Sequence, residues 1–391
     1  MKYKNASDVL PEELVKAIQE YIQGEVIYIP KADRKAYRND TEYKVELSKR
    51  NTRIFRMHLE GMSNFQLARN FSLAESSIRR ILIKEKKRFD IVSDKIKTLL
   101  PCWGLENLPI KQIYGTVWQI GEDYVLKYYT DPVALKRNIT INSHLEDMQI
   151  PVGKVIYTVD KRQYVEDNGE YFVLCLRLKG SNILSLKFGN RIAESMGRII
   201  AKLHLAFESL EEKVEVWDNS LSREMKGWVR ESFELSGWQN ISEDDYCRVS
   251  KNLENHYEKL PAGLIHRDVH FGNFLFDKGV FSGYIDFDLS QKNIRIFDLC
   301  YFSLSVLSEK EKFELSEEKW FDFIRNVFAG YNQIIELTWE EKESAVYVME
   351  CIELLFLAYF EGQDDTALAQ KTFNVFRFIS ENQRRITKSI S

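Results

Sequence analysis

The sequence is poor in cysteine and has no long apolar segment. Its five cysteines, among 391 residues, stand at positions 102, 175, 247, 300 and 351, without the spacing of a disulfide framework or a metal site. No apolar stretch approaches the ~18 residues that usually span a membrane, and the amino terminus lacks the apolar core of a signal peptide. These absences argue against a disulfide scaffold, a zinc module and a membrane protein. We therefore expect a soluble protein in a reducing cytoplasm.

The chain also lacks internal repeats and low-complexity tracts, and its charge is unevenly distributed. Residues 1–90 contain 19 Lys and Arg against 13 Asp and Glu, a net charge of +6, whereas the rest of the chain carries −10. With 44% apolar residues, the chain can form two or three domains with sizeable cores. The charge asymmetry indicates different partners for the two parts.

Residues 264–277, Leu-Ile-His-Arg-Asp-Val-His-Phe-Gly-Asn-Phe-Leu-Phe-Asp, have the residue order of a kinase catalytic loop. In such a loop Asp268 accepts the proton of a substrate hydroxyl, and Asn273 holds a magnesium ion. Asp286 follows at the spacing of the second metal ligand. Phosphoryl transfer needs such a set because catalysis consists mostly of placing cations, phosphates and one hydroxyl in line.

Two residues beside this set have less certain roles. His266 is predicted to belong to the catalytic loop by orienting it through hydrogen bonds, rather than by touching substrate. Asp288, two residues after Asp286, is either a further metal contact or a cap.

The sequence of residues 266–273 resembles the H-x-D-x-H-x-x-N block of the aminoglycoside phosphotransferase and choline kinase family. It reads His-Arg-Asp-Val-His-Phe-Gly-Asn. Residues 192–204 resemble the family's helix ending in Leu-His. Residues 296–299, Ile-Phe-Asp-Leu, resemble the segment that opens its next helix, in which we expect Asp298 to be structural. The resemblance spans roughly residues 105–380.

The resemblance implies an α+β, bilobal protein-kinase-like fold. Its small β-rich lobe would occupy residues 109–180, and its large helical lobe residues 181–391. It also implies ATP or GTP as donor, Mg²⁺ as cofactor and a small-molecule hydroxyl as acceptor.

The small lobe should supply the phosphate contacts. Short β-rich runs at 109–113, 117–120 and 124–128 are separated by hairpin residues. Gly115 permits close backbone approach to phosphate, and Thr116 follows it in the same turn.

Lys127 closes a Val-Leu-Lys run that resembles the third strand of a kinase, so we predict that it contacts the α and β phosphates. The helix expected near residues 132–146 should carry a Glu that pairs with Lys127. The family's position for this Glu falls near Asn138, which leaves Asn138, Glu146 or a missing ion pair as alternatives.

A strand predicted at residues 171–176 runs into the segment where a kinase hinge presents backbone groups to a purine. We expect the backbone from Leu176 to Leu178 to make these contacts.

Residues 1–90 are predicted to form an all-α helix-turn-helix domain, joined by a packed linker at 91–108. A capping box, Ser-Asn-Phe-Gln, opens a helix at residue 63, and a third helix is expected at 75–82. The apolar spacing expected where two helices cross involves Leu67, Ala68, Phe71, Leu73, Ile78 and Ile81. The region resembles the DNA-binding half of the Mor transcription-activator type of domain, with Ser72 where Gly is usual.

If the third helix enters a DNA major groove, its exposed polar side chains meet bases or phosphates. The candidates are Ser76, Ser77, Arg79, Arg80 and Lys84. The alternative is a helix bundle with solvated charges that serves protein contacts.

A strand predicted at residues 25–30 has no nearby partner in the sequence, after a helix that begins near Asp8. Pairing with the same strand of a second chain would satisfy its edge, and the Mor-type resemblance implies such a homodimer. Pairing with another strand of the same chain is the alternative.

The resemblance implies that the helical, aromatic-rich segments at residues 217–238 and 313–380 build the acceptor pocket. Carboxylates that could meet an amine are Glu317, Glu318, Asp322, Asp364 and Asp365, and rings that could meet a cation or a sugar are Trp217, Trp228 and Tyr359. The whole pattern predicts a small-molecule kinase for an aminoglycoside-, sugar- or amino-alcohol-like acceptor. The alternative is a transcriptional regulator whose kinase-like part senses a nucleotide or small ligand.

Overall fold

The computed structural model describes residues 15–16, 50–51, 54–55, 57–58, 62–71, 73–183, 189–211, 213–214, 219–363 and 365–391. The predictions made for Asp8, residues 25–30, Ser72, Trp217 and Asp364 lie outside these residues. The chain divides into Met1–Leu47 and Ser48–Ser391, and the features below belong to the second unit. In the described part, every helix is too short or too polar to cross a membrane.

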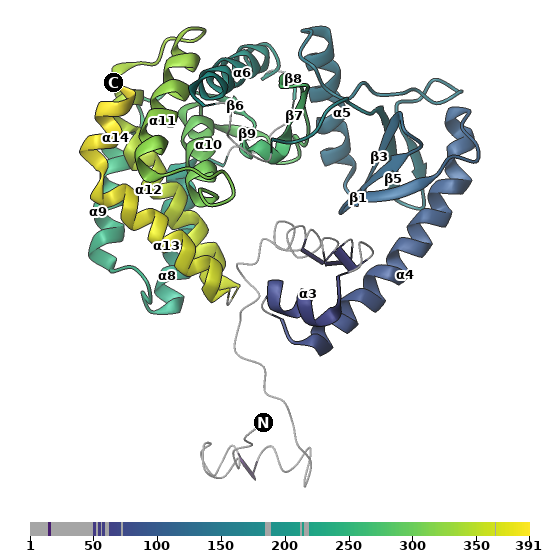
Figure 1. Cartoon of the computed structure of the whole chain (residues 1–391), viewed down its shortest axis with the longest axis horizontal. Coiled ribbons are helices and arrows are strands. Elements are labelled where there is room, and N and C mark those ends of the chain that lie inside the picture. Colours follow the sequence, from purple (N-terminus) through teal and green to yellow (C-terminus); the bar gives the residue numbers. More distant parts are fainter. Residues whose placement is uncertain are drawn as a thin grey trace. The chain divides into compact units, whose positions relative to one another are not determined.

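A five-stranded antiparallel sheet forms the small lobe (Figure 1). Its strands, in the spatial order β1-β2-β3-β5-β4, are β1 Ile110–Tyr114, β2 Val117–Ile120, β3 Tyr124–Tyr129, β4 Val165–Asp167 and β5 Glu170–Leu176. The three predicted strands and the hinge strand are confirmed. Strand β4 was missed because three residues are too few to show an alternating pattern.

Alternation along β2 and β3 decides which side chains face the site. Trp118 on β2 and Leu126 and Tyr128 on β3 are buried in one apolar cluster. Because successive strand side chains point to opposite faces, Lys127 lies on the other face, where its amino group meets Asp286.

Helix α4 (Glu75–Leu99) runs well into the predicted linker at 91–108. Its Val92 and Ile96 join Leu100 and Trp103, from the 3₁₀ helix η2 (Leu100–Trp103), in the apolar cluster of β2 and β3. The packed connection is therefore confirmed, but the third helix does not end near residue 82. It continues because residues 83–99 contain no Gly or Pro and keep apolar side chains at helical spacing.

The amino-terminal half of α4 contributes to a second, smaller apolar cluster. Its Ile78 and Leu82 are buried with Leu67 of α3 (Asn64–Asn70) and with Ile54 and Phe55. The apolar contact predicted between two helices is thus present. That the cluster is a DNA-binding helix-turn-helix domain stays a prediction.

The predicted capping box at the start of α3 is also present. The amide of Ser63 donates to Gln66 Oε1 at 2.9 Å, and the amide of Gln66 donates to Ser63 Oγ at 3.3 Å.

The opposite face of the small-lobe sheet packs against α5 (Pro132–Asp147). Asp131 caps this helix by accepting from the amide of Val133 at 2.9 Å, and Pro132 occupies the first helical position, where its missing N–H is not needed. Leu135 and Ile139 of α5 are buried with residues of β5. Helix α5 is thereby held beside the face that carries Lys127.

The large lobe is mainly helical (Figure 1). Helices α6 (Asn190–Glu208) and α11 (Glu317–Asn332) approach closely, because a Cβ at Gly197 or Gly330 would collide with backbone of the other helix. The other helices are α7 Leu221–Glu224, the π-helical turn η3 Met225–Val229, α8 Arg230–Ser236, α9 Glu243–Tyr257, α10 Ile296–Ser308, α12 Trp339–Gly362, α13 Thr366–Glu381 and α14 Gln383–Ile390.

Two antiparallel strand pairs carry the motif residues. Strand β6 (Ala262–Ile265) pairs with β9 (Gln291–Ile294), and β7 (Phe274–Asp277), which follows the 3₁₀ turn η4 (Phe271–Asn273), pairs with β8 (Val280–Tyr284). The segments after β6 and β8 meet, since the amide after β8, at residue 285, donates to the carbonyl of residue 273 at 3.0 Å. The molecule therefore has a kinase-like sheet lobe and a helical lobe.

Candidate active site

The loop that follows β6 is anchored by Asp298 at the start of α10. The backbone amides of His266 and Arg267 donate to its two carboxylate oxygens, each at 2.9 Å. His204, near the end of α6, bonds one of these oxygens at 3.0 Å. Because Asp298 is fully buried, these partners provide the hydrogen bonds that its carboxylate needs. The expected structural role of Asp298 is confirmed.

Arg267 holds the same loop through its side chain. Its guanidinium donates to both carboxylate oxygens of Glu224, at 2.8 and 3.1 Å, and lies 4.6 Å from the ring centroid of Phe297. Its φ of +72° is unusual for a residue with a side chain, as is the φ of +68° at Asp286. Such conformations cost energy and cluster at functional sites.

Asp268, the predicted proton acceptor, is held by neighbours on both sides. Tyr301 of α10 donates to its Oδ1 at 3.0 Å, and the Asn273 side-chain amide donates to its Oδ2 at 3.0 Å. His270 Nε2 lies 3.5 Å from the same Oδ2. Both carboxylate oxygens are thus fixed in direction, as a positioned base requires.

His266 does not behave as the sequence predicted. Its side chain is fully buried, its ring lies 5.0 Å from that of Phe287, and its ring nitrogens have no hydrogen-bond partner in the described part of the chain. The backbone amide of His266, rather than its imidazole, bonds Asp298. The orienting hydrogen bonds predicted for the imidazole are therefore not found among the described residues, where the ring packs against Phe287.

Asn273 and Asp286, the predicted metal ligands, lie in the two segments that meet after β6 and β8. The Asn273 nitrogen donates to Asp268, so the amide oxygen is the atom that suits a metal. An amide oxygen and a carboxylate are hard ligands that fit Mg²⁺, which usually takes one or two protein carboxylates plus phosphate oxygens. Among the described residues no group of three His, Cys, Asp or Glu side chains that could hold a metal ion is found.

Lys127 lies against two carboxylates of the segment after β8. Its Nζ is 3.4 Å from Asp286 Oδ1 and 3.7 Å from Asp288 Oδ2. Burial lowers the pKa of Lys127, but the negative charge of Asp288, with contributions from Tyr129 and Asp286, outweighs it and holds the pKa well above its usual value. Lys127 is therefore a cation at neutral pH.

The structure decides between the alternatives for the partner of Lys127. Asn138 of α5 donates to Asp288 Oδ1 at 2.8 Å, whereas Glu146 pairs with Lys154 at 2.6 Å. Neither side chain forms an ion pair with Lys127. Asp288 accepts Asn138 on one oxygen and faces Lys127 with the other. The metal contact expected of Asp288 stays a prediction.

Gly115 and Thr116 form the turn between β1 and β2, where Tyr114 pairs with Val117. Gly115 has a φ of +44° and open space where a Cβ would stand. The Thr116 carbonyl accepts from the amide of Tyr128, next to Lys127, at 3.1 Å. The predicted phosphate turn thus lies beside the Lys127 strand.

The predicted purine-facing backbone is partly engaged within the protein. The amide of Leu176 donates to Lys154 O at 2.8 Å, and the amide of Arg177 donates to Asp123 O at 2.7 Å. The purine contacts expected from the backbone of Leu176 to Leu178 stay a prediction.

The residues predicted to contact DNA lie far along the chain from this site, on the amino-terminal half of α4. Arg79, Arg80, Lys84 and Ser76 are exposed, and Ser77 is half-buried. Arg79 pairs with Glu75 at 3.5 Å. The structure brings these five together on one helix and apart from the nucleotide contacts.

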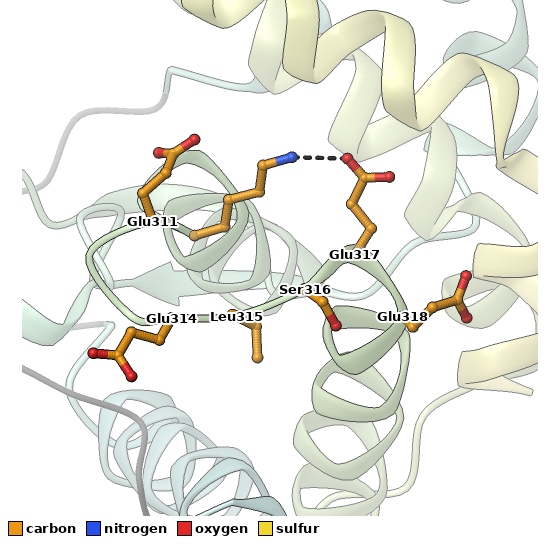
Figure 2. Close-up of a pocket in the computed structure, with 7 residues that line it drawn as sticks. Glu311, Glu314, Leu315, Ser316, Glu317 and Glu318 are labelled. Carbon is orange, nitrogen blue, oxygen red and sulfur yellow. Dashed lines mark hydrogen bonds and ion pairs between the residues drawn. The ribbon is translucent and has the colours of Figure 1, made fainter.

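The acidic residues predicted for an amine acceptor are engaged elsewhere. A cavity of about 580 Å³ lies beside the start of α11. Its lining includes Glu311, Glu314, Glu317 and Glu318 (Figure 2). Glu317 pairs with Lys310 at 2.7 Å, and Glu318 pairs with Arg385.

Asp322 pairs with Arg325, and Asp365 caps α13. This cavity lacks the motif residues, and two of its carboxylates, Glu317 and Glu318, form ion pairs within the chain. Tyr359 lies on α12 against Phe360, and Trp228 packs on the core.

The fold and the site together define a kinase-type phosphotransferase. The chain belongs to the phosphotransferase enzyme family, whose model matches residues 111–336. Homoserine kinase of Zymomonas mobilis subsp. mobilis is 25% identical over 242 residues, which are 60% of this chain and 72% of that protein. The protein is accordingly a phosphotransferase that acts on a hydroxyl acceptor.

Other similarities concern the fold and a short region. The structure of amicoumacin kinase hAmiN with AMP-PNP, Ca²⁺ and Ami has a TM-score of 0.57 at 16% identity, and covers 75% of this chain and 95% of that one. The GDP complex of aminoglycoside 2'-phosphotransferase-IIIa has a TM-score of 0.53 at 14% identity, with 75% and 99% covered. The uncharacterized protein YraL of Bacillus subtilis is 31% identical over 84 residues, which are 21% of this chain and 97% of YraL.

Sequence reasoning missed Tyr301, His270 and Tyr129 as neighbours of the motif carboxylates. A signal existed for Tyr301, which stands three residues after Asp298 and therefore on the same helix face. His270 lies inside the recognised motif. Tyr129, which donates to Asp288 at 3.2 Å, gave no signal beyond its place two residues after Lys127.

Proposed function

We propose that the protein transfers the γ-phosphoryl group of ATP or GTP to the hydroxyl of a small amino-alcohol-, aminoglycoside- or sugar-like acceptor, with Mg²⁺. The observation that carries this proposal is Asp268, fixed by Tyr301 and Asn273 beside the Asp286 segment that meets Lys127. This is the arrangement that in-line phosphoryl transfer needs.

In the proposed reaction the oxygen of the acceptor hydroxyl attacks the γ-phosphorus, and Asp268 accepts the proton of that hydroxyl. The bond from that phosphorus to the β,γ-bridging oxygen breaks, and the nucleoside diphosphate leaves. Tyr301 and Asn273 keep the carboxylate aimed, so that no reorientation is required during the attack.

Asn273 and Asp286 would hold the magnesium ion, which offsets the negative charge of the phosphates. Lys127 would bind the α and β phosphates, and the turn at Gly115 and Thr116 would place backbone beside them.

The names of similar proteins support the proposed class of acceptor. The names homoserine kinase and aminopropanol kinase both denote an acceptor with a hydroxyl and an amine.

Asp268→Asn tests the proposed chemistry. The variant keeps the shape of the side chain but cannot take the proton, so we expect the turnover number to fall by roughly 10²- to 10⁴-fold while nucleotide affinity stays unchanged. Turnover would be measured across amino alcohols, aminoglycosides and sugars with ATP and with GTP, and affinity by calorimetry.

The exposed Asp277→Asn, at the end of β7, is the matched control and should turn over like the wild type. Equal turnover of the Asp268→Asn variant and the wild type would remove Asp268 from the mechanism. A wild-type protein that binds nucleotide but phosphorylates none of the acceptors would favour the nucleotide-sensing alternative.

We also propose that the amino-terminal half of α4 binds duplex DNA. One specific observation favours this second function. Ile78 and Leu82 point into the small apolar cluster while Arg79, Arg80 and Lys84 are exposed. A helix with one buried and one basic face can approach phosphates without disturbing its own core.

For DNA binding we expect a steep fall of affinity with salt, roughly 0.9 log unit per tenfold change for each neutralised phosphate. Arg79→Ala with Arg80→Ala should lower both the affinity and the salt slope in titrations of full-length protein. Lys251→Ala with Lys259→Ala, which removes the same charge from exposed positions around α9, is the control. The absence of any DNA complex at low salt would leave protein docking as the role of this helix.

A further inference from the structure

The lysine of the phosphate site lacks a carboxylate partner from the neighbouring helix. Asn138 is the α5 residue nearest the expected position, and it carries no charge. Glu146, the other candidate on α5, is held by Lys154 at 2.6 Å and is therefore engaged elsewhere.

A chain of hydrogen bonds connects α5 to Lys127 in another way. The Asn142 amide donates to Asn138 Oδ1 at 2.9 Å, which directs the nitrogen of Asn138 outward. That nitrogen donates to Asp288 Oδ1 at 2.8 Å, and Asp288 Oδ2 lies 3.7 Å from Lys127 Nζ.

Two further groups fix Asp288. The Tyr129 hydroxyl donates to its Oδ1 at 3.2 Å, and the guanidinium of Arg137, on α5, donates to its backbone carbonyl at 3.1 Å. Both Asn138 and Arg137 are buried. The carboxylate is therefore held by α5 and β3 at once.

We infer that Asp288, held by Asn138, is the positioning residue that orients Lys127 towards the nucleotide phosphates, in place of a glutamate on α5. This inference rests on the proposed phosphate-binding role of Lys127. Asp286 lies nearer to the lysine, at 3.4 Å, but in the proposed function it holds the metal, which leaves Asp288, at 3.7 Å, as the carboxylate that orients the lysine. Asn138 acts through Asp288, so α5 is still connected to Lys127. The negative charge beside the lysine comes from the segment after β8 and not from a glutamate on α5.

The inference predicts a specific pattern in steady-state kinetics. Asp288→Asn removes the charge without changing the size of the side chain, so the KM for nucleotide should rise by roughly tenfold or more, while the KM for the acceptor stays unchanged. Asn138→Asp should also raise the nucleotide KM, because it places a second carboxylate against Asp288. Combining Asn138→Asp with Asp288→Asn restores one charge and one hydrogen bond, and should recover most of the nucleotide affinity.

Several readouts separate positioning from other roles. If Asp288 were a metal ligand, excess Mg²⁺ would restore the Asp288→Asn variant and the double variant would show no rescue; either result overturns the inference. A nucleotide KM of Asp288→Asn equal to that of the wild type overturns it as well. Thermal melting of each variant establishes that it is folded, and Glu146→Gln is the matched control on α5.

Lys127→Ala distinguishes this inference from the function on which it rests. If Lys127→Ala leaves the nucleotide KM unchanged, the proposed phosphate role of Lys127 fails. If Lys127→Ala raises the nucleotide KM and Asp288→Asn does not, only the positioning role of Asp288 fails.

Discussion

Glu353 on α12 is a carboxylic acid inside the large lobe, with only 6% of its surface exposed. Burial raises its pKa from 4.5 to about 8, against a weaker opposing effect of Lys371. Between these two pH values the folded protein keeps a proton that the unfolded chain releases. Unfolding therefore releases a proton in this window, and stability falls as the pH rises from about 4.5 to about 8.

Glu353→Gln should remove this pH dependence. Relative to the variant, the wild type should lose ~1.4 kcal/mol in the free energy of unfolding for each pH unit within the window. Denaturant titrations of both proteins at pH 5.5 and pH 8 would measure the difference. The exposed Glu258→Gln serves as control, and a constant difference between wild type and Glu353→Gln at all pH values would contradict the prediction.

Single residues were predictable from sequence where one segment contained the whole chemical pattern. Asp268 and Asn273 are five residues apart, so their spacing alone shows the loop. Asn138 and Asp288 are 150 residues apart and meet only in the folded chain. The burial of His266 was equally invisible, because a motif shows which residues recur but not which of them face solvent.

At the scale of elements, α4 belongs to two apolar clusters. The ring centroid of its Phe89 lies 5.8 Å from that of Phe55 and 5.0 Å from that of Trp118 on β2. Its Arg88 donates to the Tyr128 hydroxyl at 2.6 Å, and its Lys95 pairs with Glu170 at 2.6 Å. The carboxyl-terminal half of α4 is thus part of the small lobe.

Removing this half should destabilise the small lobe. A chain beginning at residue 109 lacks Val92, Ile96, Leu100 and Trp103, each at most 8% exposed. At ~1.5–3 kcal/mol for each buried side chain, the loss is on the order of the whole stability of a domain, ~5–15 kcal/mol. Thermal melting should show this loss, whereas a chain beginning at residue 86 keeps Arg88, Phe89 and the cluster, and serves as control. Equal melting temperatures would contradict the prediction.

The strands were predictable because their apolar alternation and hairpin residues are local. The domain boundary predicted at residue 91 was wrong. It was placed there because residues 1–90 have a net charge of +6 and contain the helix-turn-helix pattern, so the composition changes after them. A helix crosses that break without any local sign, since helical spacing continues on both sides. Only the packing of Val92 and Ile96 against the small-lobe sheet shows that α4 belongs to the small lobe as well as to the amino-terminal part.

At the scale of the whole molecule, the phosphotransferase site is built within Ser48–Ser391, the unit that also contains α3 and α4. The match of the family model begins at residue 111, so the α4 and η2 residues that complete the small-lobe core lie before it. The sequence predicted two functions for two parts of the chain. In the described residues, however, α4 carries the proposed DNA contacts in its amino-terminal half and packs on the small lobe with its carboxyl-terminal half.

Phe89 contacts both Phe55 and Trp118, so it is a direct packing connection between the two clusters. Trp118 lies on β2, directly after the phosphate turn, and Tyr128, which Arg88 contacts, adjoins Lys127. We therefore expect a partner that changes the packing of Phe89 when it binds the amino-terminal helices to change the affinity for nucleotide by some factor. By reciprocity, the nucleotide must change the affinity for that partner by the same factor.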